Sequence, residues 1–264
     1  MFKVSCIQIS SGKDIKKNFN ISKKLILKAI KQKADFIATP ETSSLFGLNK
    51  KQLLKKITSM KKDFYLKGVQ KIAKQYKKWI LVGSVLIKEN NRIKNRSVLI
   101  NPKGLIQSYY DKIHMYDVVL SKKEKYFESK TFTPGKSIKT ANLPWGKIGL
   151  SVCYDVRFPN MYRKLSKKGS LFISVPSAFT ETTGKKHWHS LLKARAIENF
   201  CYIFAPAQGG RHYNGRSTYG HSLIISPDGQ ILKELNKKEG VITVLINSSF
   251  PKKLRSIIPS LSTE

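Results

Sequence analysis

The segment KIGLSVCYDVRFP, residues 147–159, decides the fold class. Residues 147–155 are strongly apolar, with polar residues at their end, which predicts a buried strand. Pro159 is typical of the first position of a helix, so the segment predicts a strand, a turn and then a helix. Cys153 closes the predicted strand. Because ligand sites in α/β folds lie beyond the carboxyl ends of strands, Cys153 is a candidate site residue.

The rest of the chain repeats this alternation of strands and helices. Apolar runs predict further strands at residues 2–9, 36–41, 79–87, 97–104, 170–178, 201–207, 222–229 and 240–247. Apolar residues at helical spacing predict helices at residues 15–33, about 60–76 and 187–199, whereas residues 105–140 are less regular. This order predicts an α/β fold, and because many strands are apolar on both faces, both faces of the sheets should be covered. The chain has no repeats or linkers, so we expect residues 1–264 to form a single domain.

Composition excludes several classes of protein. Of the 264 residues, 41% are hydrophobic, which is enough for one sizeable core. No apolar run approaches the roughly 18 residues that a membrane-spanning helix needs, and the N-terminus lacks the layout of a signal peptide. The three cysteines, at positions 6, 153 and 201, are too few and too sparse for a disulfide framework. We therefore expect a cytoplasmic protein that does not bind a membrane.

The net charge is unusual. Fifty basic and sixteen acidic residues give +34, which raises the hypothesis of a protein that binds nucleic acid or another polyanion. Two observations weaken it. Lysines far outnumber arginines, by 42 to 8, and the lysines occur as scattered doublets rather than as a basic arm. A lysine-rich solvated surface is the simpler interpretation, and no specific nucleic-acid partner is expected.

Four polar residues form a coherent chemical set: Glu41, Lys112, Glu128 and Cys153. A thiol can attack a carbonyl carbon when a base takes its proton, and a carboxylate held out of water can be that base. A lysine supplies positive charge for the developing oxyanion, and a second carboxylate can hold the lysine in place. Spacing alone leaves alternatives open. Cys153 could be an inert buried thiol, Glu41 a helix cap after Pro40, and Lys112 one lysine among many.

The motifs around these residues resemble those of the nitrilase, or carbon–nitrogen hydrolase, superfamily. The motifs are Thr39-Pro40-Glu41, Tyr110-Asp111-Lys112-Ile113-His114, Phe127-Glu128-Ser129 and Val152-Cys153-Tyr154-Asp155-Val156-Arg157-Phe158-Pro159, and the resemblance covers essentially the whole chain. It implies an α-β-β-α sandwich that usually dimerises, so a homodimer is expected. It also implies Glu41 as general base, Lys112 as the residue that stabilises the tetrahedral intermediate, Cys153 as nucleophile and Glu128 as support for the lysine.

The resemblance implies an amidase mechanism without a metal or an organic cofactor. The thiolate of Cys153 attacks a carboxamide carbon, Lys112 and the backbone N–H of Tyr154 bind the oxyanion, and ammonia leaves to give a thioester. Glu41 then activates water to release the acid. Helix-start N–H groups after Cys153 are a further candidate source of thiolate stabilisation.

The second half of the chain resembles the branch that contains deaminated glutathione amidase. The resemblance rests on residues 176–188, 205–212 and 219–222. It implies a small amide substrate that carries a carboxylate, and Arg157 is then a candidate partner for that carboxylate, with a salt bridge to Asp155 as the equal alternative. Phe179 and Thr183 are further candidate pocket residues, and Arg211 and His212 are expected near the pocket or the dimer interface. The alternative activity is that of an omega-amidase, which acts on 2-oxoglutaramate or 2-oxosuccinamate.

Overall fold

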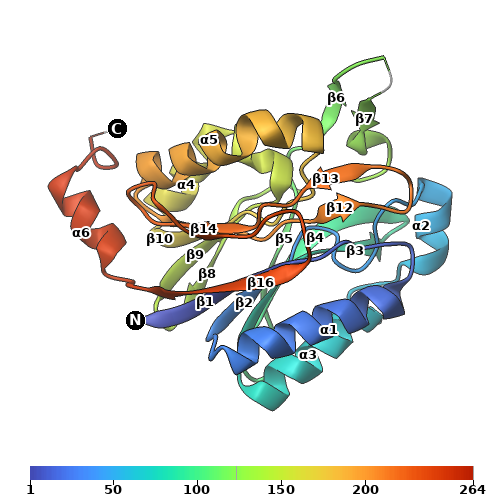
Figure 1. The fold of residues 1–264 in the computed structure, drawn as a ribbon, viewed down its shortest axis with the longest axis horizontal. Helices are drawn as coiled ribbons and strands as arrows, with labels where there is room; N and C mark the ends of the chain where they lie inside the picture. Colours follow the sequence, from blue (N-terminus) through green and yellow to red (C-terminus); the bar gives the residue numbers. More distant parts are fainter. Residues whose placement is uncertain (123, 264) are drawn as a thin grey trace.

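Two six-stranded β-sheets pack face to face, and helices cover the outer face of each sheet (Figure 1). The computed structural model describes residues 1–122 and 124–263. Helices α1 (Ile15–Lys31) and α3 (Phe64–Tyr76) lie on one side, and α4 (Pro159–Lys167) and α5 (Glu181–Asn199) lie on the other. The predicted α-β-β-α sandwich is confirmed.

The first sheet has the order β16-β1-β2-β3-β4-β5. Its strands are β1 (Phe2–Gln8), β2 (Phe36–Ala38), β3 (Trp79–Glu89), β4 (Arg92–Ile100), β5 (Ile106–Asp111) and β16 (Gly240–Ile246). β1, β2 and β3 run parallel to one another, whereas the other neighbours pair antiparallel. The carboxyl ends of β2 and β3 therefore lie at the same edge of the sheet.

The second sheet has the order β15-β14-β11-β10-β9-β8. Its strands are β8 (Lys139–Leu143), β9 (Gly146–Leu150), β10 (Ser170–Ser174), β11 (Tyr202–Ala205), β14 (Leu223–Ile225) and β15 (Ile231–Glu234). The three central strands, β9, β10 and β11, are parallel. This sheet thus also has an edge at which several carboxyl ends gather.

Shorter elements complete the fold. They are α2 (Lys50–Lys56), α6 (Phe250–Ile257), the 3₁₀ turns η1 (Glu128–Lys130) and η2 (Cys153–Arg157), the pair β6 (Asp117–Val119) and β7 (Lys125–Phe127), and the pair β12 (Gly209–Arg211) and β13 (Ser217–Tyr219). The described helices do not combine the length and the apolar character that crossing a membrane requires.

The apolar core follows the layers. Ile26 of α1 and Val69 of α3 are fully buried against Ile7 and Ile80 on the outer face of the first sheet. Between the sheets, the ring of Phe36 in β2 lies 5.8 Å from the ring of Phe204 in β11. Each such side chain contributes about 1.5–3 kcal/mol when it is fully buried. The inner faces of the sheets are therefore fixed to one another, which fixes the loops at their edges.

The structure differs from the sequence prediction at several boundaries. The helix predicted at residues 187–199 begins earlier, because the side chain of Thr180 caps it by accepting the N–H of Thr183. The strand predicted at residues 147–155 ends at Leu150, where its pairing with β10 stops. Cys153 thus opens a 3₁₀ turn rather than closing a strand. Elements not predicted from the sequence are α2, α6, β5, β6, β7, β8, β12, β13 and β15, of which β5, β6 and β7 lie in the less regular segment at residues 105–140.

Candidate active site

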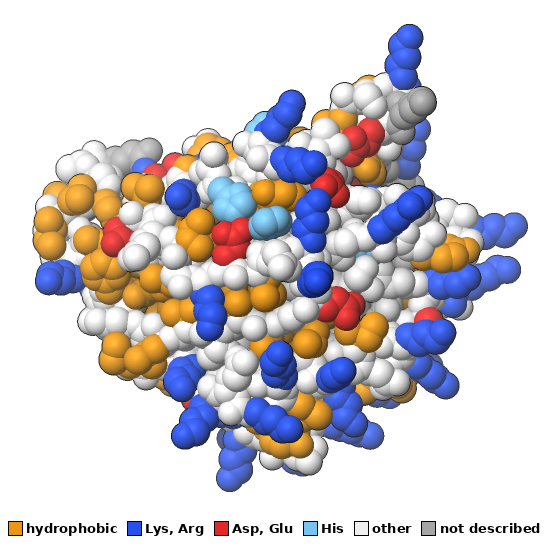
Figure 2. Space-filling view, in the orientation of Figure 1, with side chains coloured by type: hydrophobic (Ala, Val, Ile, Leu, Met, Phe, Trp, Pro, Cys, Tyr) orange, Lys and Arg blue, Asp and Glu red, His pale blue; other side chains and the backbone are white. Residues whose placement is uncertain are grey.

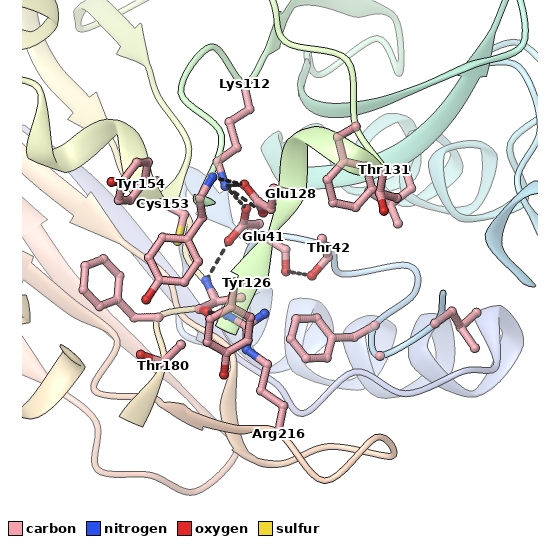
Figure 3. A pocket seen from close by; sticks show the side chains of 18 of the residues that line it. Glu41, Thr42, Lys112, Tyr126, Glu128, Thr131, Cys153, Tyr154, Thr180 and Arg216 are labelled. Carbon is pink, nitrogen blue, oxygen red and sulfur yellow. Dashed lines mark hydrogen bonds and ion pairs between the residues drawn. The ribbon is translucent and has the colours of Figure 1, made fainter. Parts of the chain in front are cut away.

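A cavity of about 240 Å³ opens where loops from both sheets meet (Figure 3). Its wall includes seven of the eight residues predicted from the sequence, which are Glu41, Lys112, Glu128, Cys153, Tyr154, Phe179 and Thr183. These residues come from segments far apart in the chain. The structure therefore brings together all four members of the predicted chemical set.

Glu41 lies in a turn that docks on an irregularity in the neighbouring strand. The pairing of β3 with β4 shifts register between Val82 and Val85. The N–H of Ser84 consequently donates to the carbonyl of Pro40 (3.1 Å), and the Ser84 hydroxyl accepts the N–H of Thr42 (2.7 Å). The register shift in β3 thus holds the backbone on both sides of Glu41.

The carboxylate of Glu41 is buried and accepts three hydrogen bonds. Its Oε1 accepts from Lys112 Nζ (3.1 Å) and from Asn95 Nδ2 (2.9 Å), and its Oε2 accepts the backbone N–H of Ala178 (2.8 Å). Three donors from three different segments fix the orientation of this carboxylate. Hydrogen bonds to a charged group are among the stronger ones in proteins.

Lys112 is held between two carboxylates. Besides Glu41, its Nζ donates to both oxygens of Glu128, at 3.0 and 2.8 Å, and Glu128 also accepts the N–H of Tyr116 (2.7 Å). Burial opposes the charge of the ammonium, but Glu128 and Glu41 outweigh it and raise the pKa of Lys112. Lys112 is therefore a buried, permanently charged cation.

Cys153 has an uncommon backbone conformation, with φ of +50°. A residue with a side chain in this region costs about 1–3 kcal/mol and persists only where the surroundings enforce it. Here the N–H of Cys153 donates to the carbonyl of Pro176 (2.9 Å), which follows β10. The turn thus directs the side chain into the cavity, beside Glu41 and Lys112 (Figure 3).

The thiol of Cys153 is protonated at rest. Its desolvation by burial, together with the negative charge of Glu41, raises the pKa of Cys153, and the positive charge of Lys112 offsets this only in part. The start of α4 lies at Pro159, beyond the 3₁₀ turn. The proposed stabilisation of a resting thiolate by helix-start N–H groups is therefore not supported, and the reactive sulfur requires a base.

Asp155 ties the lysine loop to the cysteine turn. Its Oδ2 accepts from the Tyr110 hydroxyl and the Val152 N–H, both at 2.8 Å. Its Oδ1 accepts the N–H of His114 (3.1 Å) and lies 2.7 Å from Nδ1 of the same residue. Asp155 is fully buried, so it has a clear structural role.

The structure places Arg157 outside the cavity wall. Its Nη2 lies 3.1 Å from Nδ1 of His187, and its guanidinium packs 5.4 Å from the centre of the Phe179 ring. The salt bridge with Asp155 does not form, because Asp155 is occupied by the partners described above. Arg157 thus supports Phe179, which lines the cavity together with Thr183.

Sequence reasoning missed two polar residues of the site, Asn95 and Arg216. Asn95 is a buried amide in strand β4, and the strand predicted at residues 97–104 begins too late to include it. Arg216 lies between β12 and β13 and also lines the cavity. Its only signal in the sequence is its place a few residues after Arg211 and His212.

His212 has a supporting role. Its Nδ1 lies 2.9 Å from the carbonyl of Ser11 and its Nε2 lies 2.6 Å from the Thr218 hydroxyl, while its ring packs 4.1 Å from the ring of Phe46. Burial lowers the pKa of His212 to about 4, so its imidazole is neutral at physiological pH. His212 thereby fixes Phe46, which lines the cavity, whereas Arg211 is exposed.

One group of possible metal ligands lies away from the cavity wall. Oε1 of Glu234 lies 2.9 Å from Nε2 of His189 and 2.6 Å from Nδ1 of His221. A single oxygen between two ring nitrogens is satisfied as a double acceptor. None of the three residues lines the cavity.

Comparison with known proteins identifies the family. Residues 3–255 match the carbon–nitrogen hydrolase family. The chain belongs to this family. The carbon–nitrogen hydrolase class and the amidase activity predicted from the sequence are thereby confirmed, and a polyanion-binding function is not favoured.

Individual carbon–nitrogen hydrolases agree with this placement. The chain is 37% identical to a deaminated glutathione amidase of Synechocystis sp. over 262 residues, which cover 97% of this chain and 96% of the relative. It is 35% identical to a deaminated glutathione amidase of Yersinia enterocolitica, over 98% and 91% of the two chains. The crystal structure of the Caenorhabditis elegans NitFhit protein superposes with a TM-score of 0.93 at 32% identity. That match covers 100% of this chain and 65% of the longer NitFhit chain.

Proposed function

We propose that this enzyme hydrolyses the C–N bond of a small, carboxylate-bearing amide with Cys153 as the nucleophile. In the first half-reaction the thiol gives its proton to Glu41 while sulfur bonds to the amide carbon. The C–N bond then breaks, and the proton passes from Glu41 to the leaving nitrogen. A thioester between Cys153 and the acyl group remains.

Water completes the cycle in the second half-reaction. Glu41 accepts a proton from water as the water oxygen bonds to the thioester carbon. The C–S bond breaks, the sulfur recovers the proton from Glu41, and the acid leaves. One carboxylate thus serves as base and acid in turn, and no net proton remains on it.

Lys112 has the electrostatic role in this proposal. Its charge is proposed to lie where negative charge develops on the carbonyl oxygen, and because Lys112 is buried its charge acts more strongly there than it would in water. Glu128 and Glu41 hold the ammonium in place before the reaction, and Glu128, which takes no proton in this mechanism, keeps its ion pair with Lys112 while Glu41 is protonated. Tyr154, the residue after the nucleophile, is proposed to add its backbone N–H.

The observation that carries the proposal is the shared cavity of a protonated thiol, a carboxylate and a buried ammonium. The thiol is not activated by a lowered pKa, so its chemistry depends on proton transfer to Glu41. The relatives named deaminated glutathione amidase favour deaminated glutathione over 2-oxoglutaramate as the substrate. To separate these two substrates, turnover of each is measured by the acid that forms and by the amine or ammonia that leaves.

The nucleophile is tested by replacing Cys153. We expect Cys153→Ala to lower kcat by about 10⁴-fold or more, because loss of the nucleophile removes the covalent pathway. Cys153→Ser keeps the shape of the side chain but is a much weaker nucleophile, so it should also be inactive. Circular dichroism and the urea midpoint should match those of the wild type. Retained turnover in a folded Cys153→Ala protein contradicts the assignment.

The free thiols and the exposed apolar side chains support proposals about the cellular compartment and the oligomeric state. All three cysteines are free and buried, and a catalytic thiol must stay reduced, which supports a cytoplasmic location.

Three exposed apolar side chains support a homodimer through helices α5 and α6. They are Ile197 on α5 and Ile257 and Ile258 at the end of α6. Light scattering after size exclusion should give about twice the mass of the chain.

A further inference from the structure

The cavity wall contains a second cation that forms no ion pair with the catalytic residues. Lys112 is matched by Glu41 and Glu128, but Arg216, which lines the same cavity, takes part in no ion pair among the residues that the structure describes. The carboxylate of Glu124 instead accepts from the Tyr126 hydroxyl (3.2 Å) and the Thr182 hydroxyl (2.8 Å). Arg216 is therefore a cation of the cavity wall that has no carboxylate partner among the described residues.

Arg216 is held firmly despite this. Its Nη2 donates to the carbonyl of Ala178 (2.8 Å), and its guanidinium lies 4.6 Å from the centre of the Tyr126 ring and 5.3 Å from that of Phe46. A planar guanidinium packed between two rings has lost most of its freedom before any ligand binds, which lowers the cost of binding. Both rings belong to the wall of the same cavity.

One donor of this guanidinium is buried without a partner. Nε of Arg216 has no hydrogen-bond partner among the described residues, and the only bond of the guanidinium to them is the one from Nη2. A buried donor that stays unpaired costs about 1–3 kcal/mol. Because Arg216 lines the same cavity as Cys153, a ligand in that cavity could supply the missing acceptor.

The position of Arg216 relative to the reacting atoms is set by one residue. The backbone N–H of Ala178 donates to Glu41, and its carbonyl oxygen accepts from Arg216. Figure 3 shows Lys112 and Arg216 entering from opposite sides, with Glu41 and Cys153 between them. A small molecule can therefore place an amide at Cys153 and an anionic group at Arg216.

We propose that Arg216 forms an anion subsite that binds a carboxylate of the amide substrate. A carboxylate fits better than a neutral group because the guanidinium offers several N–H donors in one plane, whose fork geometry matches two carboxylate oxygens. The subsite replaces Arg157, whose guanidinium lies outside the cavity. This inference rests on the proposed function, since it assigns the end of the substrate that does not react.

The test uses two amides that differ in one group. Glutaramate carries a carboxylate at the end of a short chain that ends in an amide, and pentanamide has a methyl group in its place. We expect Arg216→Gln to raise KM for glutaramate about 30- to 100-fold, as the loss of a charged hydrogen-bonded pair implies, and to leave KM for pentanamide within a factor of about three. Arg216→Lys, which keeps the charge but not the fork, should recover part of the loss.

Arg211→Gln is the matched control. Arg211 lies on the same hairpin and its loss changes the net charge equally, but it is exposed and does not line the cavity. Its replacement should leave KM for both amides unchanged. An equal effect of Arg216→Gln on both amides, or an equal effect of Arg211→Gln, overturns the proposal.

Equilibrium binding separates this inference from the proposed function. Calorimetry with glutarate, which cannot react, should show binding to the wild type and to Cys153→Ala but not to Arg216→Gln. If neither amide is turned over, the proposed substrate is wrong and this measurement alone decides the subsite. Equal binding to wild type and Arg216→Gln, or no binding to either, overturns the proposal.

Discussion

Glu41 meets three hydrogen-bond donors, and this arrangement defines its chemistry at the scale of a single residue. Lys112 and Asn95 bind one oxygen and the Ala178 N–H binds the other. A glutamine in its place would direct its NH₂ group at one of these donors, so the amide cannot satisfy all three. The charge of Glu41 also acts on Cys153, where it raises the pKa of the thiol.

Glu41→Gln should therefore make the Cys153 thiol more acidic and yet lower the turnover of the enzyme. Removal of the negative charge lowers the pKa of the Cys153 thiol below that of the wild type, because the neighbouring anion no longer opposes the thiolate. Turnover should nevertheless fall by about 10³-fold or more, since the proton acceptor is gone. The rate of alkylation by iodoacetamide as a function of pH reports the pKa, and the ammonia assay reports turnover.

Cys153→Ser protein gives the background of this alkylation assay, because the thiols of Cys6 and Cys201 are buried elsewhere. A thiol pKa that is unchanged or higher in Glu41→Gln would contradict the electrostatic coupling. Normal turnover in that variant would contradict the role of Glu41 as a base.

The motifs predicted the residues whose chemistry is distinctive, and they missed those defined by position. A cysteine, a lysine and two glutamates in motif context are visible in a sequence. Asn95 and Arg216 acquire their roles only when β4 and the β12–β13 hairpin are brought to the same cavity. Arg157 is the opposite case. It lies near the nucleophile in sequence and was predicted to bind the carboxylate of the substrate, but in the structure it contacts His187 and Phe179.

At the scale of elements, Gly83 joins the two halves of the site. A Cβ atom at this position in β3 would lie 1.9 Å from the Thr39 carbonyl oxygen, 2.6 Å from that of Pro40 and 2.5 Å from Cβ of Pro176. Pro40 precedes Glu41, and the Pro176 carbonyl holds the N–H of Cys153. The base and the nucleophile therefore approach each other over a strand that can carry no side chain there.

Gly83→Ala should consequently damage both stability and activity. Two of the three contacts are with backbone oxygens, which cannot move without displacing their loops, so the free energy of unfolding should fall by about 1–3 kcal/mol and kcat by more than tenfold. Urea unfolding and the turnover assay measure the two effects. Gly12→Ala is the control, because its Cβ would meet its nearest neighbour only at 4.0 Å. Full activity of Gly83→Ala would show that the two loops do not need this close approach.

Periodicity predicted the long elements and failed where a tertiary contact sets the boundary. Helix α1 and strand β1 were predicted almost to their ends, since their apolar residues repeat regularly. The turn at Cys153 was predicted as strand because its positive φ is enforced by the Pro176 carbonyl, which lies more than twenty residues away in the chain. The register shift in β3 has no local signal for the same reason.

The whole molecule carries a positive field that surrounds this site. The net charge of the chain is +34, and on the face drawn in Figure 2 the Lys and Arg side chains are scattered and acidic side chains are few. Charges scattered in this way do not mark out a groove for a nucleic acid on that face, and the long-range field of the net charge attracts small anions. The charge of the surface and that of Arg216 therefore favour the same class of substrate.

Ionic strength should distinguish the long-range field from the local contact. At about 0.01 M salt the field extends roughly 30 Å, and at 0.15 M only about 8 Å. We expect kcat/KM for the anionic glutaramate to fall several-fold over this range, whereas kcat/KM for pentanamide stays flat because it has no charge to attract. Arg216→Gln should lower kcat/KM for glutaramate at every salt concentration and leave most of the salt dependence in place, since one charge of the net +34 is removed. A flat profile for glutaramate would mean that the surface charge does not guide the substrate, and a slope lost entirely in Arg216→Gln would assign the attraction to that one residue.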